Sequence, residues 1–180
     1  MDEAVGGEPK EPRESAWTEE IELLLRDWRN RAYASQTGYY IMADRFGRRN
    51  YLLGIPVVVV SSIVGTAIFA TLKDDVGVFE RVTVGTISIL TAVLASLQTF
   101  LRFAERASVH AAGGAWYSAI LRDIESTLAL PRELRGDPKA YVDSIRKEMN
   151  KVAQKSPELN EQLWASLAKR FAVNEPPASA

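Results

Sequence analysis

Residues 51–72 read YLLGIPVVVVSSIVGTAIFATL, and residues 82–101 read VTVGTISILTAVLASLQTFL. Neither run contains Asp, Glu, Lys, Arg or His, and only the short charged segment 73–81 (KDDVGVFER) separates them. Each run is close to the length of about 20 residues with which a helix crosses about 30 Å of hydrocarbon. The β-branched residues 57–60 would favour a strand in water, but in lipid a helix satisfies its own backbone hydrogen bonds. The sequence therefore predicts a helical transmembrane hairpin, because a buried hairpin in a soluble protein needs a larger surrounding core than this chain supplies.

The composition excludes several classes of function. The chain has 180 residues, a formal net charge of −1 and no cysteine. It therefore has no disulfide framework, no thiolate nucleophile and no cysteine-based metal site. The balanced charge gives no basis for binding nucleic acid. No basic segment followed by an apolar run and a cleavage site precedes residue 50, so no secretory signal peptide is expected.

Basic residues gather on the outer sides of the two apolar runs. Arg45, Arg48 and Arg49 precede the first run, and Arg102 and Arg106 follow the second. Because positive residues accumulate on the cytoplasmic side of membrane spans, both termini are expected in the cytoplasm. The sequence thus predicts a multi-pass protein of the cell inner membrane, with the short connection on the far side.

Small and polar residues mark one side of each run. A helical stripe of the second run holds Ser88, Thr91, Ala95, Gln98 and Arg102, spaced three or four residues apart. Two interpretations of this stripe stay open: it packs against the first run, with Gln98 hydrogen-bonding across, or it lines an aqueous path between protomers. In the first run, Ser61 and Gly65 have the spacing that lets helices approach closely in lipid. Pro56 predicts a bend or a restart of the helix near the beginning of that run.

The chain outside the apolar runs predicts a helical cytoplasmic part. Residues 1–15 are rich in Gly, Pro and Glu and are expected to be a disordered tail. Apolar residues from Trp17 to Ala32 recur at helical spacing, which predicts an amphipathic helix over residues 16 to about 35, capped by Ser15. This helix either packs on another helix or lies on the lipid headgroups. The expected packing partner is an unbroken extension of the second run as far as Leu128, with an apolar stripe of Tyr117, Ile120, Ile124 and Leu128.

Two further helix starts are expected near the C-terminus. Asp137-Pro138 and Ser156-Pro157-Glu158 each place a capping residue before a first-turn proline. They predict a C-terminal helical hairpin over residues 137–172, followed by a tail over 173–180. The predicted fold class is therefore all-α: a transmembrane hairpin within residues 16–130, whose long helices extend into a cytoplasmic bundle, plus the C-terminal hairpin.

Residues that could carry catalysis are sparse. His110 is the single histidine, and without nearby carboxylates it does not make a metal site, so it is interpreted as a packing or surface residue, with a gating role as the alternative. Gly113-Gly114 lacks any phosphate-binding context and is interpreted as a close helix contact or a hinge. We expect no metal, no cofactor and no enzymatic activity.

The two apolar runs resemble a known family. Gly54-Ile55-Pro56 with the segment 61–70, and the segment 94–106 with His110 and Tyr117, are similar to the two spans of the SLATT family of two-transmembrane proteins. The resemblance covers roughly residues 17–128 and leaves the helices of 137–171 without a counterpart. It implies a homo-oligomeric effector of bacterial antiphage, or abortive infection, systems that forms a pore in the membrane or disrupts it. It also implies a separate nucleotide-signalling sensor protein, or the product of one, as the trigger.

Other functions stay open beside this one. The first is a non-conducting membrane anchor that presents a helical interaction module. The second is a direct nucleotide receptor in which the basic residues Arg45, Arg48, Arg49, Arg102 and Arg106 bind phosphate.

Overall fold

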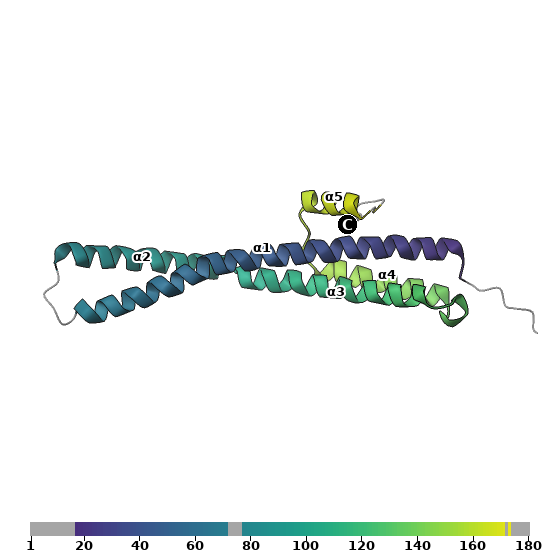
Figure 1. Cartoon of the computed structure of the whole chain (residues 1–180), viewed down its shortest axis with the longest axis horizontal. Helices are drawn as coiled ribbons and strands as arrows, with labels where there is room; N and C mark the ends of the chain where they lie inside the picture. Colours follow the sequence, from purple (N-terminus) through teal and green to yellow (C-terminus); the bar gives the residue numbers. More distant parts are fainter. Residues whose placement is uncertain (1–16, 72–76, 172, 174–180) are drawn as a thin grey trace, which may run out of the picture.

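The computed structural model describes residues 17–71, 77–171 and 173, and these residues form an all-helical structure (Figure 1). Its elements are α1 (Glu19–Thr71), α2 (Val78–Leu101), α3 (Phe103–Ala129), a short 3-10 turn η1 (Arg132–Leu134), α4 (Pro138–Lys155) and α5 (Glu161–Arg170). No strand occurs among the described residues, and the predicted all-α class is confirmed. The predicted tail 1–15 with its cap Ser15, residues 73–76 of the predicted connection, and the predicted tail 173–180 apart from residue 173 lie outside the described residues.

The first helix runs without a break into the first apolar run. α1 is one continuous helix of 53 residues, which corresponds to about 80 Å at 1.5 Å per residue. It begins at Glu19, where the hydroxyl of Thr18 accepts a hydrogen bond from the N–H of Ile21 at 3.4 Å. Pro56 lies inside the helix, so the predicted restart does not occur. Proline has no N–H to give to the preceding turn, which favours a bend, and Figure 1 shows α1 changing direction in its C-terminal half.

The predicted unbroken helix from residue 82 to Leu128 is wrong. α2 ends at Leu101, and α3 begins at Phe103. Between them Arg102 has the left-handed backbone angles φ 48° and ψ 40°, and it is the only non-glycine residue with positive φ among the described residues. The break turns Phe103 inward, where its ring stacks on Phe46 of α1 at 6.2 Å between centroids. We attribute the break to this packing, because no local sequence pattern predicts a break at Arg102.

The charged half of the molecule has an apolar core between α1 and α3. Trp17, Leu25, Ala32 and Tyr39 of the N-terminal segment pack against Tyr117, Ile120, Leu121 and Ile124 of α3, with Ile145 and Val152 of α4 closing the cluster. The pairing of the two predicted apolar stripes is thus confirmed. Trp17 is only 2% exposed, and its indole N–H donates to the carbonyl of Gly136 at 2.9 Å. The N-terminal helix is therefore a packing helix, and the alternative with Trp17 as a headgroup anchor is wrong.

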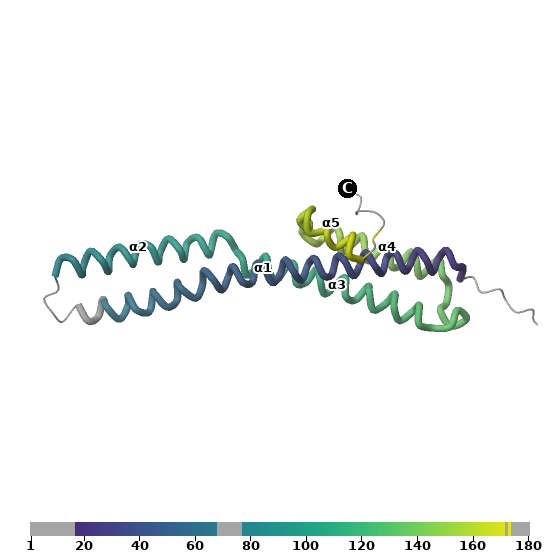
Figure 2. The backbone as a smooth tube through the Cα atoms, turned by 45° about the horizontal axis from the view of Figure 1, so that its top comes forward, coloured from purple at the N-terminus to yellow at the C-terminus, as the bar shows by residue number. Residues whose placement is uncertain are grey.

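The two C-terminal helices lie on different partners. α4 begins as predicted, because Asp137 accepts a hydrogen bond from the N–H of Ala140 at 3.0 Å and Pro138 follows it. α5 begins at Glu161 after the cap Asn160, whereas the expected start at Ser156 is in fact the end of α4. α4 packs along α3, and α5 packs on α1 (Figure 2). The expected hairpin is therefore two helices docked separately on the long pair.

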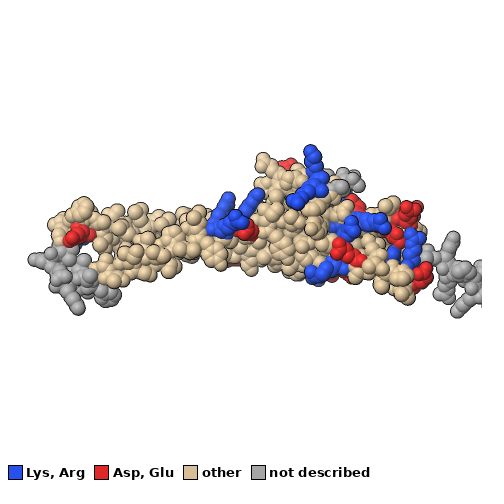
Figure 3. Space-filling model, viewed as in Figure 1, with Lys and Arg blue, Asp and Glu red and all other residues tan. Residues whose placement is uncertain are grey.

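Charge is segregated along the molecule. Figure 3 shows Lys, Arg, Asp and Glu over the half that holds α3, α4 and α5, whereas the other half is bare up to its tip. The bare half consists of the C-terminal part of α1 together with α2. Its large apolar side chains are exposed, including Leu52, Ile63, Leu90 and Phe100. By length and composition, two helices of the structure are able to cross a membrane.

Candidate functional site

The small and polar stripe of α2 faces α1. Ser88, Ala95 and Gln98 are partly buried and Thr91 is buried, whereas Ile89, Leu90 and Val93 on the other side are exposed. The hydroxyls of Ser88 and Thr91 donate to carbonyls of their own helix, at 2.8 Å each. The structure thus places four of the five predicted stripe residues in a contact within the chain.

Gln98 lies directly against the backbone of α1. A Cβ atom added to Gly54 would be 2.8 Å from Nε2 of Gln98, so a larger residue at this position would require the side chain of Gln98 to move. Asn50, Tyr51 and Ile55 line the same shallow hollow of about 260 Å³. In the sequence Gly54 stands out only as part of the resemblance to the SLATT family, because its pairing with Gln98 depends on the register of the two helices.

Arg102 leaves the stripe at the break between α2 and α3. Its side chain is 66% exposed and forms an ion pair with Glu105. The left-handed backbone at this position rotates the chain, so the regular spacing that placed Arg102 in line with Gln98 no longer applies.

The predicted close-packing pair of α1, Ser61 and Gly65, makes no close contact with another helix among the described residues. Ser61 is exposed, and no described atom of another element comes within 4 Å of a Cβ built on Gly65.

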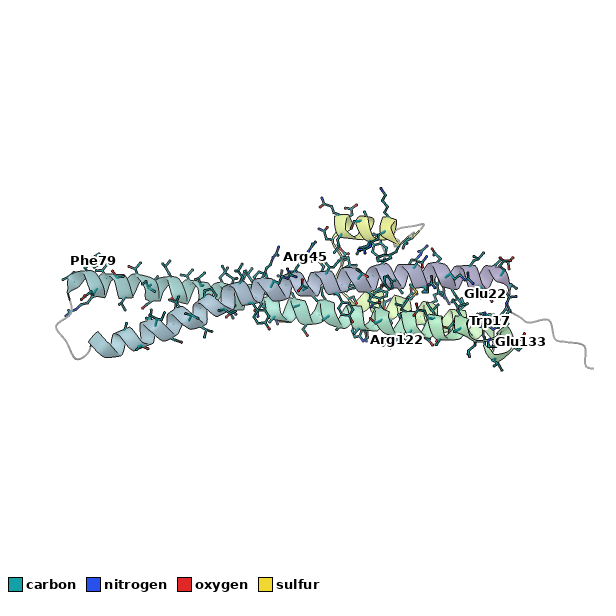
Figure 4. The ribbon with its side chains drawn as sticks, viewed as in Figure 1. Trp17, Glu22, Arg45, Phe79, Arg122 and Glu133 are labelled. Carbon is teal, nitrogen blue, oxygen red and sulfur yellow. The ribbon has the colours of Figure 1, made fainter. Side chains whose placement is uncertain are left out.

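Four of the predicted boundary arginines are exposed on the surface. Arg48 pairs with Asp44 at 2.8 Å, and the guanidinium of Arg49 lies 6.0 Å from the ring centre of Phe46. Arg45 and Arg106 are also exposed. Figure 4 places Arg45 midway along the molecule, between Phe79 at one end and Trp17 at the other. The arginines therefore form a belt where the bare half meets the charged half.

A hollow of about 420 Å³ lies at this belt. Its lining comes from three parts of the chain: Phe46 of α1, the start of α3 with Arg102, Glu105, Arg106, Val109 and His110, and Pro157. His110 is 5% exposed, and its ring stacks on Phe46 at 5.3 Å between centroids. Burial lowers the pKa of His110 below its usual value, which favours the neutral form of the imidazole. His110 and the arginines stand out in the sequence by residue type, whereas no pattern in it places Phe46 or Pro157 at this hollow.

Next to the hollow, an aromatic cluster joins α1, α3 and the segment before α5. Tyr39 stacks on Tyr117 at 5.7 Å, and its hydroxyl donates to the carbonyl of Pro157 at 2.9 Å. Burial is the main cause that raises the pKa of Tyr117 to about 12. Gly113 and Gly114 lie under the rings of Tyr39 and Tyr40, where an added Cβ would be 3.1 Å and 2.9 Å from the nearest ring carbon. The glycine pair is thus a close helix contact.

Comparisons with protein-family models, with curated proteins and with solved structures find nothing that matches this chain. The similarity to the SLATT family remains a prediction from the residues quoted above. Within the described residues, no group of three or more His, Cys, Asp or Glu side chains is placed to hold a metal ion.

Proposed function

We propose that the chain is a two-span protein of the cell inner membrane that acts as a self-assembling, non-enzymatic effector. The observation that carries the membrane part is the bare half of the molecule. There, large apolar side chains such as Leu52, Ile63 and Phe100 are exposed in a single chain. In water such a surface is an aggregation liability, whereas a bilayer covers it without cost.

The arginine belt supports an orientation with both termini in the cytoplasm. Arg45, Arg48 and Arg106 lie where the bare half ends, as expected for positive residues at the cytoplasmic edge of a membrane. Trp17 and the C-terminal helices lie on the charged side of this belt.

A second copy of the chain is the partner that we propose for the outer face of α3. Residues 107–121 of α3 carry no charge, although one side of this segment is exposed. The exposed side holds two larger residues, Val109 at 42% and Trp116 at 43% exposure. The residues around them are small: Ser108, Ala112, Ala115 and Ala119. Helices approach closely across such small residues. Arg122 and Asp123, at the end of this face, provide both signs of charge for pairing between parallel copies.

The effector role rests on the resemblance to the SLATT family. By that likeness, assembly of several copies opens a pore or disrupts the membrane and arrests an infected cell, after a signal from a separate nucleotide-signalling protein or its product. No catalytic step is part of this proposal.

A second candidate function is a non-conducting anchor for the helical cytoplasmic part. One observation favours it: Ser88, Thr91, Ala95 and Gln98 are engaged with α1 of the same chain. A pore lined by this stripe requires α2 to turn away from α1 on assembly, whereas an anchor requires no such change.

The test compares two substitutions on opposite sides of α2. Protein reconstituted into liposomes is assayed for dye leakage, and expression in bacteria is assayed for growth arrest. Gln98→Leu removes the polar group of the stripe, and Thr99→Leu makes a matched change on the exposed side. A stripe-lined pore predicts that leakage and arrest are lost with Gln98→Leu and kept with Thr99→Leu. If both variants still arrest growth and neither causes leakage, growth arrest does not depend on a pore. That result would contradict the pore and favour the anchor.

A further inference from the structure

The break at Arg102 creates a helix N-terminus at the arginine belt. α3 begins at Phe103, and no side chain caps its first turn. The first N–H groups of any helix lack intrahelical partners, and such groups suit an anion. Most helix starts meet this need with a Ser, Thr, Asp or Asn cap, but here the cap position is an arginine.

Two arginines add positive charge at the same place. Arg102 and Arg106 both line the hollow of about 420 Å³ at the start of α3. The first ion-pairs with Glu105, whose carboxylate also lines the hollow. One anion of the chain itself is thus already held beside this helix start.

A buried histidine forms another wall of the hollow. The side chain of His110 is 95% buried, and its Nδ1 is enclosed with no hydrogen-bond partner among the described residues. Buried polar atoms are nearly always paired, so the unpaired Nδ1 of His110, beside two arginines and an uncapped helix start, marks a site that is incomplete without a ligand. The apolar side chains of Phe46 and Val109 provide room for the organic part of such a ligand.

We propose that this hollow binds a phosphate group. The N–H groups at a helix start and the planar guanidinium of arginine both suit phosphate oxygens, and arginine binds them with two parallel hydrogen bonds. A phosphate that enters takes over Arg102 from Glu105, so the carboxylate occupies the site in the absence of ligand. Removal of the Glu105 charge therefore strengthens phosphate binding, and removal of the Arg106 charge weakens it.

The phosphate group that binds in this hollow belongs either to a lipid headgroup or to a soluble compound. The hollow lies at the edge of the bare half, so a phosphate of a lipid headgroup reaches it if the chain lies in a bilayer as proposed above. A soluble phosphate compound reaches it from the cytoplasmic side, and binding of this kind does not depend on the membrane location.

The single histidine of the chain makes the test direct. The full chain, with its histidine isotopically labelled, is purified in a zwitterionic detergent, and the imidazole NMR signals are followed as pyrophosphate is added. A second arm places the protein in nanodiscs of phosphatidylcholine with or without phosphatidylglycerol. The variants are Arg106→Gln, Glu105→Gln and, as a matched control in the same belt, Arg45→Gln, each checked for its helical circular dichroism spectrum.

The proposal predicts a saturable shift of the His110 signals in at least one arm. Arg106→Gln weakens the binding about tenfold, Glu105→Gln strengthens it several-fold, and Arg45→Gln changes it less than twofold. A shift with pyrophosphate identifies a soluble phosphate ligand, and a shift only with phosphatidylglycerol identifies a lipid. No shift in either arm overturns the proposal, as does an equal effect of Arg106→Gln and Arg45→Gln. Binding of pyrophosphate in detergent would stand even if the proposed membrane function failed.

Discussion

At the scale of single residues, Arg102 has the most consequence for the shape of the molecule. It ends α2 in a left-handed conformation that side chains with a Cβ atom disfavour, and it starts α3 on a new line. The cost of this conformation is offset by burial of Phe103 and His110, which pack on Phe46 once the chain has turned.

A comparison of Arg102→Gly with Arg102→Ala isolates the backbone cost at this position. Both variants lose the ion pair with Glu105, but only glycine adopts φ 48° without strain. Arg102→Gly should therefore be more stable than Arg102→Ala by about 1 kcal/mol in denaturant unfolding of the detergent-solubilised protein. Equal stability of the two variants would mean that the helix is not broken at this position.

Glu22 should make the stability of the charged half depend on acid. Its carboxylate accepts hydrogen bonds from Arg135 at 2.6 Å and Arg132 at 2.8 Å, and these lower its pKa from 4.5 to about 2. Because the folded-state pKa is the lower one, the stabilisation is complete above about pH 4.5 and is lost as the pH falls toward 2. Thermal unfolding should show Glu22→Gln well below the wild type at pH 7, with a smaller gap at pH 3. The exposed Glu133→Gln serves as the control, and a gap that does not change with pH would contradict this role for Glu22.

At the scale of the elements, the sequence predicted the type of structure better than its breaks. Charge-free length indicated the two apolar helices, and helical spacing paired the stripes of Trp17–Ala32 and Tyr117–Leu128 correctly. The cap Asp137 was found because its signal is local. The break at Arg102 and the contact of Gly54 with Gln98 depend on residues distant in the chain, which propensity does not report. The start of α5 has a local cap, Asn160, but the signal of Ser156-Pro157 pointed to an earlier start. In the candidate site, His110 and the arginines stood out by type, whereas Phe46 carried no signal and Pro157 indicated only a helix start.

Alanine substitution should change the stability in opposite directions at a glycine packed between α1 and α3 and at a glycine with open space beside it. A Cβ at Gly114 would lie 2.9 Å from the ring of Tyr40, whereas a Cβ at Gly47 would meet nothing within 4 Å among the described residues. Gly114→Ala should therefore destabilise by about 1–3 kcal/mol through overpacking. Gly47→Ala should stabilise by about 0.5–1 kcal/mol through helix propensity. Denaturant unfolding of the two variants checks both signs, and stabilisation by Gly114→Ala would contradict the close packing.

At the scale of the whole molecule, the chain combines a packed half with a half that leaves its apolar surface uncovered. The packed half has the core expected of a protein in water, centred on residues such as Leu25 and Ile124. The bare half has no such core. Among the described residues, its two helices, α1 and α2, pack only on each other there. Lipid and further copies of the chain are the partners proposed for the surfaces that remain.

Assembly through the outer face of α3 should depend on Trp116 more than on other exposed apolar residues. Trp116→Ser removes the largest exposed side chain of that face, and Leu23→Ser makes a matched change on α1. The mass of the protein in detergent, measured by light scattering, should fall with Trp116→Ser and stay unchanged with Leu23→Ser. An unchanged mass with Trp116→Ser would exclude this face as the interface between copies.

The membrane location is tested most directly with single cysteines, because the chain has none of its own. Ser62, in the bare half, and Ser126, in the charged half, are both exposed in the structure. Ser62→Cys and Ser126→Cys are each treated with a charged, membrane-impermeant maleimide in inside-out membrane vesicles and again after detergent denaturation. A protein embedded as proposed reacts at Ser126→Cys in vesicles but reacts at Ser62→Cys only after denaturation. Equal reaction of both cysteines in intact vesicles would contradict the membrane location.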